Sequence, residues 1–386
     1  MKPGITLFLT ICLLGIPLLQ NCGGGEQAAV PSPMIRPGEI WPDNNGVHIN
    51  AHGGGILFHD GAYYWFGEHK IEGREGNRAM VGVHCYSSTD LYHWTDRGIA
   101  LAVSEDPESE IVQGAVIERP KVIHNEKTGK FVMWFHLELK GQGYSAARTG
   151  LAVSDTVTGP YTYLRSFRPN AGTWPLNFPE ELKTGPISNE TLDQGTEEWH
   201  EANLNGMFVR RDFEGGQMAR DMVLFVDDDG SAYHIHASEE NGTLHISELS
   251  DDYLSFTGRW IRAFPGAHNE APAVFKRDGK YYMITSGCTG WAPNAARSAV
   301  AGAMLGEWRA LGNPSRGTEE QNETTFESQS TFVIPVQGKP GAHIFMGDRW
   351  RPKNPIDGRY IWLPIQWEEE KPVLRWMDEW SLDVFE

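Results

Sequence analysis

Residues 270–287 read EAPAVFKRDGKYYMITSG: a polar residue opens a short apolar strand, a Gly-centred turn follows, and a second, aromatic-rich strand begins. Four other segments have the same order, at 51–68, 118–136, 220–236 and 329–350. Hairpins repeated about every 40 to 50 residues are typical of a propeller, in which each blade sends an equivalent residue to one central funnel. The pattern predicts an all-β fold, a five-bladed β-propeller, whose facing positions are His52, Glu118, Asp221, Glu270 and Gln329.

The segments after each hairpin predict the rest of the blade. SSTDLYHW at 87–94 and LSDDYLSFTG at 249–258 are examples of a third, outer element. Asp-Gly and Thr-Gly dipeptides predict the tight turns between strands. The stretch 359–385 is strand-like but has no repeat of its own, so we expect it to pair with residues 38–50 and close the ring, which removes an exposed sheet edge.

The composition excludes several classes of partner. The 386 residues carry a formal net charge of −18, so we expect no binding to the phosphates of nucleic acid or, through charge, to anionic lipid. The fourteen Trp and twelve Tyr mostly fill the blades and leave some rings as platforms for sugars. Cys85 and Cys288 predict neither a disulfide framework nor a thiolate metal site, and both are interpreted as buried small hydrophobes. We expect a monomer that acts on an oligosaccharide or polysaccharide.

The N-terminus predicts an exported protein. Met1 and Lys2 precede a short apolar stretch, so residues 1–21 read as a signal peptide. The order Leu-Leu-Gln-Asn before Cys22, with three glycines after it, resembles a bacterial lipoprotein cleavage site, at which the cysteine becomes lipidated. Residues 22–37 then form a flexible tether, and the protein is held on a bacterial membrane, in the periplasm or at the cell surface. Ordinary secretion with a free Cys22 is the alternative.

The propeller is expected over residues 38–386, with one interruption. The interval between the turns at Gly129 and Gly230 is longer than the others by about one blade. Residues 168–217, within this interval, are rich in Pro, Gly, Asn and acidic residues and lack the repeat signature. We interpret them as a long loop at the rim of the funnel, with a sixth blade as the alternative. Long ordered loops in compact domains tend to be functional.

Three of the five facing positions are carboxylates: Glu118, Asp221 and Glu270. Like charges brought together cannot all ionise freely, so the pKa of at least one should rise. A carboxyl with a raised pKa can act as the general acid that glycosidic bond cleavage requires, and this chemistry needs no cofactor. The alternative is a structural role, in which acidic residues cap turns or bind a cation such as calcium at the propeller axis.

Six motifs follow one another along the chain: ERPKVI, ARDMVLF, NEAPAVF, SGCTGW, ESQSTF and GDRW. They resemble glycoside hydrolase family 43, five-bladed propeller enzymes that invert the anomeric centre, and most of all its branch of exo-β-1,3-galactanases. The resemblance runs from about residue 40 to the C-terminus. It implies that Glu270 is the general acid, that Asp221 tunes the pKa of Glu270, and that Glu118 is a catalytic-site carboxylate that orients the sugar.

The sequence departs from the wider family at the base. Most members begin the first blade with an Asp as general base, whereas residues 50–53 read NAHG. The galactanase branch shares this absence, and the resemblance gives the attacking water to Gln329. A neutral amide is a poor base but can orient water, through an imidic tautomer or a nearby carboxylate. Glu327 is expected on the same face of the strand and is the reserve candidate for the base.

The resemblance also implies substrate contacts. Carboxylates accept hydrogen bonds from sugar hydroxyls, and an indole face stacks on the C–H surface of a pyranose. Trp291 follows a glycine in a loop, where packing demands little of it, so a sugar platform is favoured. His52 is a substrate contact in the funnel or a cation ligand, and a buried, hydrogen-bonded histidine is the alternative. The predicted contacts are Glu68, Tyr144, Asn241, Thr289, Trp291 and His52.

The sequence therefore predicts an exo-acting, inverting glycoside hydrolase that releases galactose from β-1,3-galactan or from arabinogalactan side chains. A β-galactofuranosidase or an α-L-arabinofuranosidase on the same fold is the second hypothesis. The hypothesis from another class is a surface lipoprotein that binds glycan without cleaving it. Such a protein keeps its aromatic platforms and loses the acid, so the presence of Glu270 and Asp221 argues against it. The insertion at 168–217 is expected to wall the funnel and admit a chain end.

Overall fold

The structure is a computed structural model that describes residues 1, 4, 33–188 and 191–386. The chain divides into two units, Met1–Pro33 and Met34–Glu386. Most of the predicted signal peptide, together with Cys22, lies outside the described residues. Within the described part of the chain, no helix is both long and apolar enough to cross a membrane.

The unit Met34–Glu386 is built from antiparallel sheets whose strands pair in chain order. Blade I holds β1 (His52–His59), β2 (Ala62–Glu68), β3 (Gly82–Ser88) and β4 (Thr95–Ala102). Blade II holds β5 (Val116–Asn125), β6 (Lys130–Glu138), β7 (Arg148–Ser154) and β8 (Thr162–Phe167). Blade III holds β9 (Met222–Val226), β10 (Ala232–Ser238), β11 (Thr243–Leu249) and β12 (Phe256–Ala263). Blade IV holds β13 (Glu270–Arg277), β14 (Lys280–Ser286), β15 (Arg297–Ala301) and β16 (Trp308–Gly312), and blade V holds β17 (Gln329–Pro335), β18 (His343–Arg349) and β19 (Arg359–Pro364).

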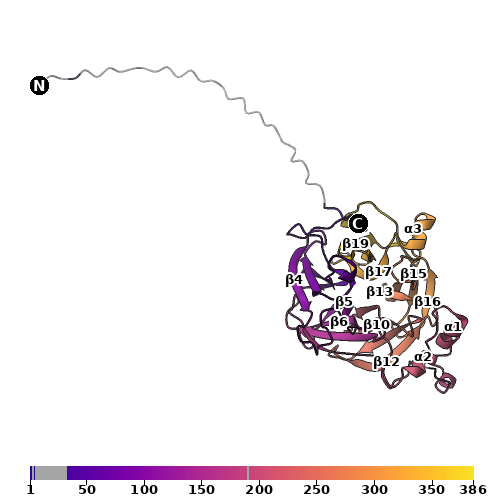
Figure 1. Cartoon of the computed structure of the whole chain (residues 1–386). Coiled ribbons are helices and arrows are strands. Elements are labelled where there is room, and N and C mark those ends of the chain that lie inside the picture. The colour runs from indigo at the N-terminus through magenta and orange to yellow at the C-terminus, as the bar shows by residue number, and fades with distance from the viewer. Residues whose placement is uncertain (2–3, 5–32, 189–190) are drawn as a thin grey trace. The chain divides into compact units, whose positions relative to one another are not determined.

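The five first strands close a ring. Each of β1, β5, β9, β13 and β17 contacts the next, and β17 returns to β1. Figure 1 shows the sheets arranged around this centre. The hairpin turns have the predicted chemistry, because Asp60 and Gly61, like Asp278 and Gly279, all have positive φ, as a type I′ turn requires. The predicted five-bladed β-propeller is confirmed.

The ring is closed differently from the expectation. Residues 38–50 do not pair as a strand with the C-terminal stretch. Instead an isolated antiparallel bridge joins Ile35 to Trp380, and the Gly38 N–H donates to the Tyr360 carbonyl at 2.9 Å. Pro37 and Pro42 interrupt this segment, and a proline has no N–H for a ladder.

Packing of aromatic rings takes the place of the missing ladder. Trp41 meets Trp362 of β19 with ring centroids 4.9 Å apart, and Trp362 packs on Trp65 of blade I at 5.0 Å. The remaining C-terminal residues form a separate hairpin, β20 (Gln366–Glu368) with β21 (Lys371–Val373). The contact between blades V and I therefore combines apolar burial with single hydrogen bonds, such as that from the Gly53 N–H to Asp348 at 3.1 Å, instead of a strand ladder.

The insertion between β8 and β9 is more than a loop. It contains the 3₁₀ turn η2 (Glu180–Leu182) and the helices α1 (Glu197–Leu204) and α2 (Met207–Arg211). Phe178 and Val209 of the insertion bury Trp260 of β12, the outer strand of blade III. Figure 1 shows α1 and α2 beside β12, and the expectation of a plain rim loop is corrected. The other short helices are η1 (Arg74–Asn77), α3 (Glu319–Thr324), η3 (Pro355–Asp357) and η4 (Leu382–Phe385).

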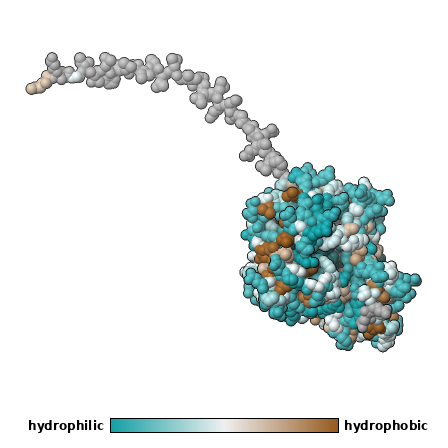
Figure 2. Space-filling view, viewed as in Figure 1, coloured by the Kyte–Doolittle hydropathy of each residue, from teal (hydrophilic) through white to brown (hydrophobic). Residues whose placement is uncertain are grey.

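In Figure 2 the visible face of this unit is mostly hydrophilic, and apolar residues gather only in small groups. The insertion has its own apolar cluster, in which Trp199 of α1 packs with Phe208 of α2. The insertion is thus a packed layer on blade III and not a strand of the repeat.

We predict that Trp260→Ala lowers the free energy of unfolding by about 3–5 kcal/mol, the usual cost of removing a buried aromatic ring. Trp260 is fully buried between the insertion and blade III. Trp291→Ala is the matched control, because its ring is 39% exposed and should cost less than about 0.5 kcal/mol. Urea unfolding measures both. Equal losses, or no loss at Trp260, would show that the insertion is not packed on the blade.

Candidate active site

A cavity of about 320 Å³ opens at the centre of the propeller. All five blades contribute to its wall. The lining residues from the blades are Glu68 of blade I, Glu118, Arg119, His136 and Tyr144 of blade II, Arg220, Asp221 and Asn241 of blade III, Glu270, Cys288, Gly290 and Trp291 of blade IV, and Gln329 and Trp350 of blade V. Gln194 of the insertion completes the wall. A cavity that collects polar side chains from every blade is the funnel that the repeat predicted.

The four predicted catalytic residues meet in this cavity. Glu270 is the first residue of β13 and Gln329 the first of β17, while Asp221 directly precedes β9 and Glu118 is the third residue of β5. The same phase of the repeat therefore delivers them to one place. Among the predicted substrate contacts, four also line the cavity: Glu68, Tyr144, Asn241 and Trp291.

A bulge at the start of the inner strands aims these side chains. The register shifts between Glu118 and Lys121 and again between Glu270 and Ala273. The residue after each glutamate, Arg119 or Ala271, has positive φ, of 56° or 49°. Bulges next to active sites commonly re-aim a side chain, at a cost in backbone strain.

His52 does not line the cavity, so the prediction of a substrate contact is wrong for this residue. Its ring is buried against Tyr360, with centroids 5.3 Å apart, because blade V brings Tyr360 and Gly358 against the start of β1. Burial lowers the pKa of His52 well below its usual value, with nearby Lys70 adding to the shift. His52 is a neutral histidine of the core.

Thr289 and Glu327 also lie outside the cavity wall. The Thr289 hydroxyl donates to the Ala292 carbonyl at 2.6 Å, so the Thr289 side chain is directed toward its own loop. Glu327 precedes β17 in a left-handed conformation with φ of 59°, so the alternation of a strand does not apply to it. Its carboxylate pairs with Arg349 at 3.4 Å, and Glu327 lines, together with Gln329, a neighbouring cavity rather than the one that holds Glu270.

Glu270 has the properties of a proton donor. Burial, and next the negative charge of Asp221, raise the pKa of Glu270 to about 7. Asn241 donates from Nδ2 to Oε1 of Glu270 at 2.8 Å. Glu270 is therefore protonated over the lower half of the neutral range, as a general acid must be.

Arg119 makes the electrostatic surroundings of Asp221 different from those of Glu270. Its Nη2 donates to Oδ2 of Asp221 at 2.8 Å and to Oε1 of Gln329 at 2.6 Å. Despite burial, which lowers it, the pKa of Arg119 is raised by Asp221 and other carboxylates, so the guanidinium stays charged. The same cation pairs with Asp221 and fixes the side chain of Gln329.

Gln329 can orient a water molecule but its oxygen cannot take a proton from one. Oε1 accepts from Arg119 and, at 3.0 Å, from Nε1 of Trp350, which occupies both of its lone pairs. Nε2 donates to the Ser286 hydroxyl at 3.0 Å and keeps one N–H. These contacts favour the ordinary amide over the imidic tautomer, because the oxygen faces two donors.

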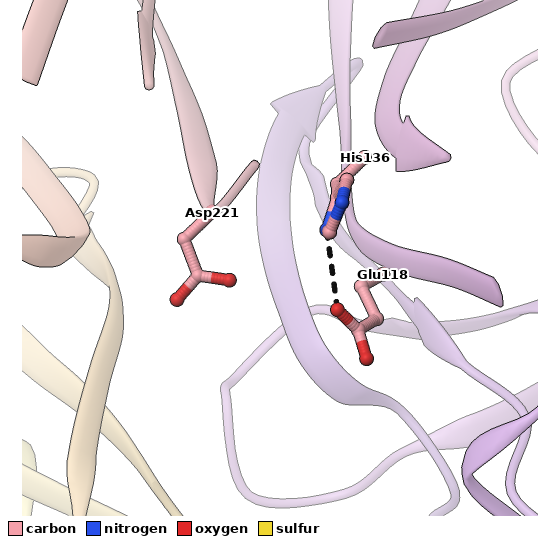
Figure 3. Close-up of side chains that lie close together, drawn as sticks. All are labelled: Glu118, His136 and Asp221. Carbon is pink, nitrogen blue, oxygen red and sulfur yellow. Dashed lines mark hydrogen bonds and ion pairs between the residues drawn. The ribbon is translucent and has the colours of Figure 1, made fainter. Parts of the chain in front are cut away.

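A chain of buried hydrogen bonds keeps Glu118 ionised. His136 lies between two carboxylates, with Nδ1 3.1 Å from Glu118 and Nε2 2.9 Å from Glu138, and Tyr144 donates to Glu118 at 2.7 Å. Figure 3 shows His136 and Glu118 joined in this way, with Asp221 on the separate segment that leads into β9. Burial raises the pKa of Glu118, but the hydrogen bond and charge of His136 outweigh it and lower the pKa to about 2.

The protonation of His136 follows from the same contacts. Burial lowers the pKa of His136, but the hydrogen bonds to Glu118 and Glu138 raise it to about 9. His136 is therefore an imidazolium at neutral pH, and Glu118 is a permanently ionised acceptor beside the protonated Glu270. Two carboxyl groups with opposite protonation states are what acid catalysis combined with sugar binding requires.

Comparison with known proteins agrees with this geometry. The profile of glycosyl hydrolases family 43 matches residues 191–372. A family 43 β-1,3-galactosidase solved with galactodeoxynojirimycin is 55% identical, with a TM-score of 0.84 over 90% of this chain and 100% of that one. The chain belongs to glycoside hydrolase family 43. Among curated protein sequences, none matches significantly.

Two further relatives of this family 43 enzyme are longer proteins. An exo-β-1,3-galactanase from Phanerochaete chrysosporium, solved with β-1,3-galactotriose, is 32% identical, with a TM-score of 0.71 over 91% of this chain and 68% of that one. An exo-β-1,3-galactanase from Clostridium thermocellum is 36% identical, with a TM-score of 0.72 over 90% and 66%. The chain thus spans about two thirds of each of these relatives.

Ligand atoms of Glu118, His136 and Asp221 lie within 4.8 Å of one another, the spacing of a metal site. The chemistry of the group does not fit a cation. The His136 imidazolium has no free lone pair, and Arg119 already occupies Asp221. Calcium at the axis fits no better, since Lys121 donates from Nζ to the Gly53 carbonyl at 2.8 Å between the inner strands.

Several cavity residues of the family 43 enzyme were not predicted. Arg119 and Trp350 stand inside the quoted motifs ERPKVI and GDRW, which was the only signal for them. His136 ends an aromatic strand and carries no signal of its own. Cys288 was interpreted as buried, but it is half-buried and lines the cavity beside Glu270.

We predict that His136→Gln destabilises the protein by about 3–5 kcal/mol, because removing one partner of a buried ion pair leaves the other charge uncompensated. His124→Gln is the control, since His124 pairs only with the exposed Glu126 and should cost about 0–1 kcal/mol. Urea unfolding at pH 7 measures the difference. If the two variants were equally stable, His136 would not be a buried imidazolium.

Proposed function

We propose that this family 43 enzyme removes single galactose residues from the non-reducing ends of β-1,3-galactan and of arabinogalactan side chains, with inversion of the anomeric centre. The observation that carries the proposal is that Glu270, whose pKa is raised to about 7, and Asp221 line one cavity. The relatives support the sugar and the linkage, because the β-1,3-galactosidase is 55% identical and aligns over its whole length. The two exo-β-1,3-galactanases support the exo mode of action.

The proposed reaction follows from the protonation states. Glu270 donates its proton to the glycosidic oxygen as the bond from the anomeric carbon breaks, a water molecule attacks the opposite face of the sugar, and the proton that this water loses passes to solvent water. The free N–H of Gln329 orients the oxygen of this water. Burial and the negative charge of Asp221, which pairs with Arg119, keep the pKa of Glu270 high until the proton leaves. None of the carboxylates that line the cavity is assigned the role of nucleophile.

The walls of the cavity suit one hexopyranose. Ionised Glu118 accepts from a sugar hydroxyl, and Glu68 and Tyr144 lie beside it in the wall. The indole of Trp291 is 39% exposed and meets Trp350 at 5.6 Å, so it offers a face to the C–H surface of a sugar. Arg119 and Gln329, which hydrogen-bond to one another, form the floor of the cavity. A cavity with such a floor favours entry of a chain end.

We further propose that the enzyme works outside the cytoplasm on a lipid anchor. The support is the sequence alone: a signal-like apolar stretch, Cys22 followed by glycines, and a tether up to residue 37. Such an anchor would keep the enzyme near polysaccharide fragments at the membrane.

The products of the purified protein test the proposal. From β-1,3-galactotriose we expect galactose and galactobiose, with the α-anomer of galactose in the first proton NMR spectra, because inversion of a β-linkage gives the α-anomer. With a long β-1,3-galactan, galactose should appear before the viscosity falls.

Three other outcomes would contradict the proposal. A first-formed β-anomer would rule out inversion. Cleavage of arabinofuranosides or galactofuranosides in preference to β-1,3-galactan would indicate the second hypothesis. Binding of galactan without any cleavage would indicate a glycan-binding protein.

A further inference from the structure

The turn that carries Asn241 is strained. Three successive residues, Glu239, Glu240 and Asn241, have φ of 52°, 56° and 61°, and none is a glycine. Left-handed conformations cost free energy in residues with a side chain, and they persist only where the surroundings hold them. The turn ends at Asn241, which donates from Nδ2 to Oε1 of Glu270 at 2.8 Å. Contacts around this turn must offset the free-energy cost of its conformation if Asn241 is to stay in place beside the general acid.

The first support is a buried ion pair. The Glu239 carboxylate is fully buried, and Arg262 of β12 binds both of its oxygens, at 2.7 and 2.6 Å. His245 approaches the same carboxylate at 2.8 Å. Burial raises the pKa of Glu239, but the charge of Arg262 outweighs it and lowers the pKa to about 2. The first residue of the turn is therefore fixed as an anion.

The second support comes from the insertion. Arg211 of α2 pairs with the Glu240 carboxylate at 2.9 Å, and Gln194 donates to the Glu240 carbonyl at 2.7 Å. Asn203 of α1 accepts from Arg262 at 2.5 Å. Gly242, which follows the turn, packs so closely on Asn203 that a Cβ atom would lie 2.1 Å from its Oδ1. The insertion thus contacts the turn at the Glu240 carboxylate, at the Glu240 carbonyl and at Gly242, where the turn ends.

The held turn decides which oxygen of Glu270 carries the proton. An amide N–H at Oε1 makes that atom the carbonyl oxygen of the protonated carboxyl, so the proton sits on Oε2. Oδ1 of Asn241 has no hydrogen-bond partner although it is buried in the cavity wall, so it is free to accept from a substrate hydroxyl. A shift of Asn241 would therefore change the direction of the acid.

We propose that the insertion between β8 and β9 is a positioning element for the general acid: through Gln194 and Arg211 it clamps the turn Glu239–Asn241 and so aims the proton of Glu270. This inference deepens the proposed function and rests on the role of Glu270 in it. The insertion acts through Asn241 rather than by walling the funnel, and Gln194 is its one residue in the cavity wall among those described.

Glu240→Gly is the decisive variant. Glycine adopts φ near 56° without strain, so the folded backbone is relieved while the pair with Arg211 is lost. A merely structural turn would then keep its melting temperature and its kinetics. Asp278→Gly is the matched control, because Asp278 is also an acidic residue with positive φ, of 51°, in the β13–β14 turn away from the cavity. Glu240→Gln, which keeps the backbone and removes only the charge, is the second variant if the glycine variant fails to fold.

The readout is the dependence on the leaving group. Cleavage of a β-1,3-galactobiose needs a well-aimed acid, whereas a dinitrophenyl β-galactoside has a leaving group that departs without protonation. For Glu240→Gly, kcat on galactobiose should fall by about 10-fold or more, since a 1 Å misplacement costs about 10². Its kcat on the dinitrophenyl substrate should stay within about twofold, as should both rates of Asp278→Gly.

Glu270→Gln separates this inference from the proposed function. If Glu270→Gln loses galactobiose cleavage selectively and Glu240→Gly does not, the clamp is wrong and the general acid stands. If Glu270→Gln itself loses no selectivity between the substrates, the proposed function fails. Selective loss in both Glu270→Gln and Glu240→Gly, or in Glu240→Gln where the glycine variant is unfolded, supports the clamp.

Discussion

Burial of Glu270 beside Asp221 is the constraint around which the site is arranged. Burial disfavours the ionised form of Glu270 and the negative charge of Asp221 adds to this effect, while Arg119 donates a hydrogen bond to Asp221 at 2.8 Å. The proton is therefore left on Glu270. The left-handed bulge of β5 brings Arg119 to this position, and the guanidinium then has a second N–H bond to spare for Gln329. One cation thus sets the acid and the water-binding amide together.

The repeat in the sequence predicted the fold and the position of the catalytic strands, because the phase of each hairpin is a local property. Glu118, Asp221, Glu270 and Gln329 share that phase, and burial of the apolar strands brings it to one funnel. His52 shares it too and was misplaced, since Tyr360 of blade V, more than 300 positions away, covers its ring. Arg119 and His136 escaped prediction for a related reason: their roles arise from contacts between side chains of different strands and blades, which periodicity does not report.

Burying the charged groups of the cavity costs free energy, and contacts next to those groups offset this cost. Glu118, Glu138 and His136 are all buried, and such a triad adds little to stability unless every hydrogen bond is made. Here Tyr144 and the Ala147 N–H complete the network at the two carboxylates. The strained turn Glu239–Asn241 is supported in the same manner by Arg262 and the insertion. Rigid polar networks of this kind suit a reaction whose hydrogen-bond donors must already be oriented toward the reacting atoms before the substrate binds.

The most direct measurement of the central claim is the pH dependence of kcat/KM on a β-1,3-linked galactobiose, which reports the ionisation of the free enzyme. Because only protonated Glu270 can donate, activity should be present at low pH and fall as the pH rises through about 7. In Asp221→Asn, the loss of a neighbouring negative charge removes a cause of the raised pKa, so this limb should move to lower pH in the residual activity. A limb that stays in place in Asp221→Asn, or one that is absent between pH 5 and 9, would contradict the account.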